Sequence, residues 1–382
     1  MGGNKKSYEY ILIDDIFVNV NQNVLKLYYN LYKRAKPFEH FNRIARRWLP
    51  SFLLRAIRIL QFTQKYVQSR KKYYTENSIP SIVSQHDGNC LVKLRQGGYK
   101  IFNFKKGIVI TTYPRHIPLA NMNKRIKKIK TSEKCILAPR LINCNIKERF
   151  LVEEYQNMRR CSYNLFNVNR FIIKISPILG EIISVDQPKH VNQYQYSLDK
   201  IQYIESHINK SPRGYNNEDS IKQFLNYLKK KFAKNIGAKN QVMLVFSHGD
   251  LWEGNILSKG KQAGVIDWDT IGCRSFYYDF YFSIFMLASK GKHFDQIDYE
   301  SLTFLNNELD TSVMLYSKLL ESFKRKNNHS MIIPKQFDLY RYLFYIELLV
   351  LKLKETHNSQ KENVNEVDTW IERFRFIENL RT

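Results

Sequence analysis

Residues 245–269 constrain the fold of this chain more than any other segment. Two short apolar runs, at 256–258 and 263–266, lie on either side of a Gly-containing turn. This pattern predicts an antiparallel β-hairpin. With the turn centred near residue 261, the hairpin is expected to pair Asn255 with Asp267 at its open end.

The expected open end of the hairpin gathers hard oxygen ligands. A carboxamide and a carboxylate suit Mg²⁺, which usually binds one or two protein carboxylates together with substrate phosphates and water. Asp250 lies five residues before Asn255, on the loop that enters the hairpin. We expect Asp250 to orient a substrate hydroxyl and accept its proton, while Asn255 and Asp267 hold the metal. The alternative is a hairpin with solvent-facing polar ends, which the surrounding apolar residues disfavour.

Three motifs in this region resemble those of the aminoglycoside phosphotransferase and choline-kinase-like superfamily, which has the protein-kinase fold. The H-G-D-x-x-x-x-N motif is present from His248 to Asn255, and an I-D-W-x motif follows at 266–269. The Asp that anchors the next helix in this family matches Asp279. The resemblance implies that Asp250 is the catalytic base, that Asn255 and Asp267 bind magnesium, and that the nucleotide is ATP. It implies structural support from His248, Asp269 and Asp279.

The resemblance implies an α+β, bilobal protein-kinase-like fold, with a small antiparallel-sheet lobe and a larger helical lobe. Residues 1–80 are predicted to form a basic, mostly helical N-terminal extension. Residues 81–158 are predicted to form the nucleotide-binding sheet and hinge, because strand-like runs alternate with Gly-containing turns. Residues 159–382 are predicted to form the helical lobe with the catalytic and metal-binding motifs.

Four further positions are assigned to the nucleotide on the family pattern. The Gly97-Gly98 turn would cover the nucleotide, although a Gly-Gly turn is usually only a hairpin turn. The strand-like run at 150–155, with Glu153 and Glu154, resembles the hinge strand whose backbone meets the adenine. Both assignments depend on the order of elements along the chain.

One family feature is missing. The third strand of such kinases normally offers a lysine to the phosphates, but the corresponding run at 109–113 contains none. The acid that usually orients this lysine is also absent from the basic stretch at 123–130. One hypothesis is that Lys100 on the adjacent strand supplies the missing charge; the alternative, which the sequence favours, is a strand lysine that faces solvent.

The net charge of +26 is concentrated near the N-terminus, because residues 1–160 carry +22 and residues 161–382 carry +4. Residues 41–72 hold nine basic residues and no acid, within a helical pattern of apolar positions. Arg55, Arg58 and Lys65 recur at helical spacing and are expected on its polar edge. A basic amphipathic helix of this kind can bind an anionic membrane surface. The alternative, which the sequence slightly favours, is a helix that packs on the protein body with its basic edge in solvent.

The sequence favours a cytoplasmic protein, peripheral to the membrane if the basic helix binds one. No apolar run reaches the length of a membrane span, and the apolar content of 43% supports a sizeable core. The five cysteines are scattered without a C-x-x-C pair, which is typical of reduced thiols.

The class of molecule whose hydroxyl accepts the phosphate is inferred from charge. A site for a polycationic aminoglycoside should be acidic, so the weak positive charge of residues 161–382 favours the hydroxyl of another small molecule or of a cell-envelope sugar or glycan. Two other functions remain open. One is a pseudokinase scaffold or nucleotide-binding protein, suggested by the missing lysine. The other is a nucleic-acid-binding protein, which the lack of a recognised binding motif makes unlikely.

Overall fold

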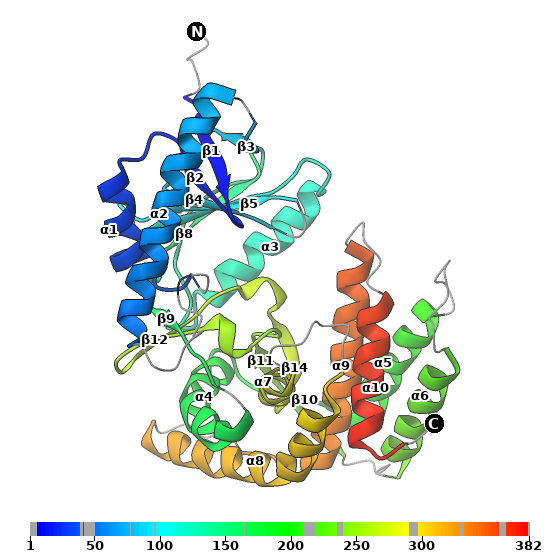
Figure 1. Cartoon of the computed structure of the whole chain (residues 1–382). Coiled ribbons are helices and arrows are strands. Elements are labelled where there is room, and N and C mark those ends of the chain that lie inside the picture. Colours follow the sequence, from blue (N-terminus) through cyan, green and yellow to red (C-terminus); the bar gives the residue numbers. More distant parts are fainter. Residues whose placement is uncertain are drawn as a thin grey trace. The chain divides into compact units, whose positions relative to one another are not determined.

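The computed structural model describes residues 6–38, 41, 50–76, 78–94, 97–163, 165–208, 218–234, 240–289, 297–327, 332–358 and 364–380. The chain divides into two compact units (Figure 1). The first unit comprises residues 1–161 and 256–269, and the second comprises residues 162–255 and 270–382. The prediction that all catalytic and metal-binding motifs share one lobe is therefore wrong: the chain returns to the first unit at residue 256.

An eight-stranded sheet forms the centre of the first unit, in the order β3-β1-β2-β4-β5-β6-β8-β7. All neighbouring strands are antiparallel, and β-branched residues dominate strands such as β6, as expected for a pleated, half-buried surface. The strands are β1 (Tyr8–Ile13), β2 (Ile16–Asn19), β3 (Ser81–Ser84), β4 (Cys90–Lys93), β5 (Tyr99–Asn103), β6 (Ile108–Thr112), β7 (Leu141–Asn145) and β8 (Phe150–Glu154).

The N-terminal residues are part of this sheet. Strand β2 pairs directly with β4, and β1 joins β2 to β3. The prediction of a mostly helical extension over residues 1–80 therefore missed two strands, which belong to the same sheet as β4 to β6. Tyr10, Ile11 and Ile13 in β1 are buried, and the sheet is their core environment.

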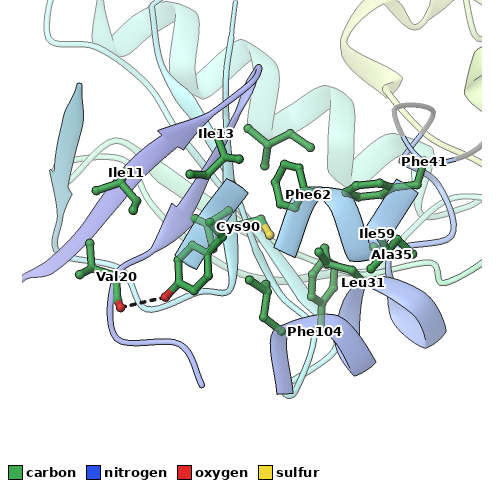
Figure 2. Packing of buried hydrophobic residues seen from close by; sticks show 14 residues of the cluster. Ile11, Ile13, Val20, Leu31, Ala35, Phe41, Ile59, Phe62, Cys90 and Phe104 are labelled. Carbon is green, nitrogen blue, oxygen red and sulfur yellow. Dashed lines mark hydrogen bonds between the residues drawn. The ribbon is translucent and has the colours of Figure 1, made fainter. Parts of the chain in front are cut away.

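Two helices of the N-terminal region, α1 (Val24–Arg34) and α2 (Ser51–Glu76), pack against the sheet. Figure 2 shows Ile59 and Phe62 of α2 beside Leu31 of α1 and Cys90 of β4. The Tyr66 hydroxyl donates a hydrogen bond of 2.9 Å to the backbone carbonyl of Val20. The inward face of α2 is thus fixed both by apolar burial and by hydrogen bonding.

Helix α3 (Leu119–Ser132) and a second, three-stranded sheet complete the first unit. This sheet has the order β13-β12-β9, with β9 (Arg159–Arg160), β12 (Ile256–Lys259) and β13 (Gln262–Val265). Ile256 pairs with Val265 around a two-residue turn, in which Gly260 has φ +60°. The predicted Asn255–Asp267 pairing is wrong by one residue, because the turn is centred between Gly260 and Lys261.

Helices dominate the second unit, which also holds a small antiparallel sheet in the order β10-β11-β14. The predicted fold class is confirmed: one unit is built on an antiparallel sheet and the other is mainly helical. The elements of the second unit are α4 (Val168–Ile183), β10 (Lys189–Asn192), α5 (Gln193–Ile208), α6 (Glu218–Ala233), β11 (Gln241–Ser247), β14 (Gly272–Ser275), α7 (Tyr278–Ala288), α8 (Tyr299–Lys326), α9 (Phe337–Asn358) and α10 (Val364–Ile377).

Helix α7 lies in the core of the second unit. Almost every residue from Tyr278 to Ala288 is buried, as expected for a helix that is apolar on all sides. Among the residues that the structure describes, no helix combines the length and the apolar character needed to cross a bilayer.

Candidate active site

The loop that follows strand β11 contains His248, Gly249 and Asp250. Asp279, in the first turn of α7, accepts hydrogen bonds from the backbone N–H groups of His248 and Gly249, both at 2.8 Å. The side chain of Asp279 is buried, so these charge-assisted hydrogen bonds compensate its desolvation. Asp279 thereby ties the loop to the core helix α7.

His248 has no exposed surface. Its Nδ1 accepts a hydrogen bond of 3.2 Å from the backbone N–H of Asp250, and its carbonyl accepts one of 2.9 Å from the Thr270 hydroxyl. These are the contacts of a side chain that shapes the loop. Gly249 has φ +86°, and a Cβ at this position would meet the Arg274 guanidinium and the Thr270 carbonyl.

Asn255 is buried at the end of a short 3₁₀ turn, η3 (Glu253–Asn255). Its Nδ2 donates to the backbone carbonyl of Asp250 at 2.8 Å and to the Asp250 carboxylate Oδ2 at 3.2 Å. Because Nδ2 faces Asp250, the amide oxygen of Asn255 points to the other side. Two of the predicted residues, Asp250 and Asn255, are therefore held together within the second unit.

Asp267 follows strand β13 with φ +70°, a conformation that is uncommon for residues other than glycine. Its Oδ1 lies 3.4 Å from Lys100 Nζ on strand β5. Asp267 raises the pKa of Lys100; burial opposes this rise, and Glu153 and Asp269 add to it. Lys100 therefore interacts with the carboxylates of Asp267, Glu153 and Asp269. The alternative prediction was a strand lysine that interacts only with solvent.

Thr111 stands where the sequence comparison expected a lysine. It pairs directly with Lys100 across strands β5 and β6, so both side chains are on the same face of the sheet. The Thr111 hydroxyl is buried and finds no hydrogen-bond partner among the described residues. Lys100 thus brings a cation to the face of the sheet on which the missing third-strand lysine would lie.

Glu153 is near this face of the sheet as well. Strand register makes Leu151 the direct partner of Thr111, so Glu153 is a diagonal neighbour of Thr111. Burial raises the pKa of Glu153 to about 7; Lys100 lowers it, whereas Asp269 and Asp267 raise it. Glu154 is more exposed and pairs with Arg140 at 3.4 Å.

Strand β8 pairs through its backbone with β6 on one side and with β7 on the other. The amides of Glu154 and Tyr155 donate to the carbonyls of Arg140 and Gly107, each at 2.9 Å. The prediction that the 150–155 run itself meets the adenine through its backbone is therefore wrong for these two amides, because the sheet already satisfies them.

The Gly97-Gly98 pair lies in the turn between β4 and β5, where residues 95 and 96 are outside the described part of the chain. The backbone N–H of Leu94 donates a hydrogen bond of 2.8 Å to the carbonyl of Gly98. A Cβ on Gly98 would collide with the Thr112 carbonyl of β6. Close packing of two backbones therefore explains this glycine.

Helix α3 contributes two residues that the sequence analysis missed. Lys128 Nζ donates to the Asp269 carbonyl at 2.9 Å, and Arg125 lies 3.7 Å from the Asp269 carboxylate. Arg125 also stacks over the Tyr113 ring at 5.0 Å. The sequence signal that could have identified them is the three-residue spacing of Arg125 and Lys128, which places both side chains on one face of the helix. The basic helix thus fixes the loop that carries Asp267.

Lys352 on α9 is a third residue that the sequence analysis missed, and it interacts electrostatically with the predicted base Asp250. Its Nζ lies 3.0 Å from both Glu355 and Glu366. Burial alone would lower the pKa of Lys352, but Glu355, Glu366 and Asp250 together raise it. Asp250 therefore stands in a charged environment within the second unit.

No cluster of three or more His, Cys, Asp or Glu side chains suited to a metal ion occurs among the described residues. Each unit offers one hard oxygen donor of the kind that magnesium prefers: the Asn255 amide in the second unit and the Asp267 carboxylate in the first.

Comparisons with known proteins show what parts of the chain are similar to. The model of the phosphotransferase enzyme family matches residues 207–297. A search of curated protein sequences found no match.

Three solved structures illustrate what the chain is similar to. The choline kinase LicA from Streptococcus pneumoniae is 14% identical, with 83% of this chain and 99% of that chain covered and a TM-score of 0.46. A glucosamine kinase in complex with glucosamine, ADP and inorganic phosphate is 10% identical, with 76% and 79% covered and a TM-score of 0.48. A gentamicin–APH(2")-IIa complex is 14% identical, with 76% and 91% covered and a TM-score of 0.41.

The family match spans the segment in which the H-G-D-x-x-x-x-N and I-D-W-x motifs and Asp279 lie. Over residues 207–297 the chain therefore matches the phosphotransferase enzyme family, and the predicted family resemblance and enzyme class are confirmed on that segment.

Proposed function

We propose that this chain is an ATP- and magnesium-dependent phosphotransferase that phosphorylates a hydroxyl group of a small molecule or of a cell-envelope sugar or glycan. One observation carries the proposal: in the family-matched segment, Asn255 holds the backbone and carboxylate of Asp250, and Asp279 holds the same loop to helix α7. Such a fixed carboxylate is what phosphoryl transfer to a hydroxyl requires.

Asp250 is the proposed catalytic base. Its carboxylate orients the acceptor hydroxyl and takes its proton as the hydroxyl oxygen bonds to the γ-phosphorus of ATP. The bond from that phosphorus to the β,γ-bridging oxygen breaks, and ADP leaves with the electron pair. The Asn255 amide keeps the carboxylate in place during this step.

Asn255 and Asp267 are the proposed magnesium ligands. Bound magnesium supplies charge neutralisation for the β- and γ-phosphates. Lys128 and Arg125 stabilise the loop through Asp269, so the Asp267 carboxylate keeps a defined position. Asp269, like His248 and Asp279, is assigned a supporting role.

Lys100 is the proposed phosphate-binding cation. Its contact with Asp267 and its place opposite Thr111 support this role, and the same observations weigh against a pseudokinase function based on the missing lysine. The turn at Gly97-Gly98 is proposed to lie over the nucleotide. Glu153 is proposed to act on the nucleotide through Lys100, and Glu154 remains assigned to the nucleotide-binding strand.

The acceptor is proposed to be a sugar or glycan hydroxyl. The second unit is nearly neutral overall, which gives no excess of acid for a polycation. Nucleic acid is an unlikely partner, since the basic residues of α3 serve the Asp269 loop.

The test is an ATP-consumption screen over sugars, amino alcohols and envelope glycans with the full chain. Asp250→Asn keeps the shape of the side chain and should reduce turnover about a thousandfold, because the base is lost. Asp219→Asn, at an exposed position on α6, is the matched control and should leave turnover unchanged. Equal turnover by the wild type and Asp250→Asn would exclude Asp250 as the base.

Nucleotide and metal binding are measured separately from turnover. Calorimetric titration of ADP should show tighter binding with magnesium than with EDTA. Asp267→Asn should remove most of that difference, because one carboxylate ligand is lost. If ADP fails to bind in the presence of magnesium, the chain is not a nucleotide-dependent enzyme.

A further inference from the structure

Helix α2 exposes apolar side chains on the face that points away from the protein. Its inward residues Ile59, Phe62 and Tyr66 are at most 2% exposed. In contrast, Leu60 is 51% exposed, Val67 46%, Ile57 44% and Leu53 41%. We refer to these four exposed residues as the α2 apolar band.

The band follows the geometry of the helix. Leu53, Ile57 and Leu60 are spaced by four and three residues, so they form one line along the side opposite Ile59, Phe62 and Tyr66. An amphipathic surface helix normally turns polar residues to this side. Several exposed apolar side chains along one line of a helix offer a surface that an apolar partner can cover.

A basic row runs along one edge of the band. Arg58, Lys65 and Lys72 are seven residues apart, which keeps them near one line on a helix. Lys65 is 2.7 Å from Asp14, and it remains 55% exposed. The predicted membrane-binding stretch 41–72 also includes residues 42–49, which lie outside the described part of the chain; their sequence contains three arginines and no acid.

One basic residue of α2 holds the helix to the protein body. Arg55 is buried, and it donates to the carbonyls of Leu31 at 2.7 Å and Ala35 at 2.9 Å, at the C-terminal end of α1. The sequence alone placed Arg55 with the solvent-facing basic residues. Because Arg55 points inward, the outward face is left more apolar than the sequence suggests.

We propose that the α2 apolar band, with the basic row Arg58, Lys65 and Lys72, docks this protein on an anionic lipid surface. Apolar side chains would enter the boundary between headgroups and acyl chains, while the basic row neutralises lipid charge. Charge complementarity selects this partner, since the first 160 residues carry a net charge of +22. Nucleic acid fits less well, because its interfaces are polar and offer nothing to cover the band.

Vesicle flotation tests the proposal with the full-length chain. Vesicles of phosphatidylcholine alone are compared with vesicles that contain an equal amount of phosphatidylglycerol. The wild type should bind the anionic vesicles and bind the neutral ones at least about tenfold more weakly. Absence of binding to anionic vesicles, or equal binding to both kinds, would overturn the proposal.

Two variants separate the apolar and basic contributions. Ile57→Glu/Leu60→Glu should weaken binding to anionic vesicles about a hundredfold, and Arg58→Gln/Lys72→Gln about twenty-fivefold. Matched controls on other helices are Ile173→Glu on α4, where the side chain is 56% exposed, and Lys318→Gln/Lys326→Gln on α8. The controls should bind like the wild type. Leu53→Gln/Leu60→Gln repeats the apolar test without added charge if the glutamate variant fails to fold.

Two outcomes would assign the band to another partner and overturn lipid docking. One is binding of duplex DNA that falls with Arg58→Gln/Lys72→Gln but not with Ile57→Glu/Leu60→Glu, together with no vesicle binding. The other is a dimer in light scattering that Ile57→Glu/Leu60→Glu converts to a monomer, again without vesicle binding. Neither outcome affects the proposed phosphotransferase function, because the ATP-consumption screen contains no lipid vesicles.

Discussion

Lys100 Nζ on strand β5 lies 3.4 Å from Asp267 Oδ1. The strand next to it, β6, carries Thr111 directly opposite Lys100. The side chains of two directly paired residues point to the same face of a sheet. A lysine on either of the two strands can therefore place its ammonium group on that face. This register supports the proposal that Lys100 takes the place of the missing third-strand lysine.

Removal of Lys100 should impair nucleotide use. We expect Lys100→Ala to lower kcat/KM for ATP about a hundredfold, because a phosphate-facing cation is lost. Lys93→Ala, at an exposed site on β4, should have no effect. The double variant Lys100→Ala/Thr111→Lys should recover part of the loss in steady-state kinetics. A Lys100→Ala enzyme with wild-type kinetics would show that this lysine is not used.

Glu153 should make stability depend on pH. Burial raises its pKa from 4.5 to about 7, so the folded protein binds the proton more tightly than the unfolded chain. The contribution of Glu153 protonation to the free energy of unfolding is complete below about pH 4.5 and is lost as the pH rises through about 7. The loss amounts to about 3 kcal/mol. Urea unfolding with EDTA present should therefore show Glu153→Gln gaining stability relative to wild type as the pH increases. Parallel pH profiles for the two proteins would contradict this.

Asp279 should be essential for the stability of the catalytic loop. Asp279→Asn replaces one acceptor by an NH₂ group that faces a backbone N–H, so we expect a loss of about 2–3 kcal/mol in the free energy of unfolding. Urea denaturation measures the loss. Glu300→Gln, at an exposed carboxylate on α8, is the control and should change the unfolding free energy by less than about 0.5 kcal/mol. A similar small change in Asp279→Asn would show that the two hydrogen bonds contribute little.

Gly98 should tolerate no side chain. In Gly98→Ala the new Cβ meets the Thr112 carbonyl, and we expect a loss of about 3 kcal/mol in stability. Gly107→Ala is the comparison, because Gly107 has φ +67° and open space around it, so only backbone strain of about 1 kcal/mol is added. Thermal unfolding of both variants distinguishes the two. Equal losses would mean that the contact with β6 relaxes without cost.

The sequence predicted individual elements well where the signal is local. The β12–β13 hairpin, the strands β4 to β6 and the basic helix α3 all follow from turn residues and apolar periodicity. Strands β1 and β2 were missed because the short run from Tyr10 to Ile13 alone does not distinguish a buried strand from a helix segment. Arg55 was assigned to the wrong face because helical spacing does not show where a neighbouring helix ends.

The sequence by itself determined the chemistry of the candidate site, because the types and spacing of His248, Asp250, Asn255 and Asp267 lie within one short segment. Only the tertiary structure decided that Lys100 faces Asp267, since that contact joins residues 167 positions apart through sheet register. It also decided that α2 presents an apolar face outward. Both outcomes depend on which surfaces become buried against distant parts of the chain, and local sequence patterns do not encode that.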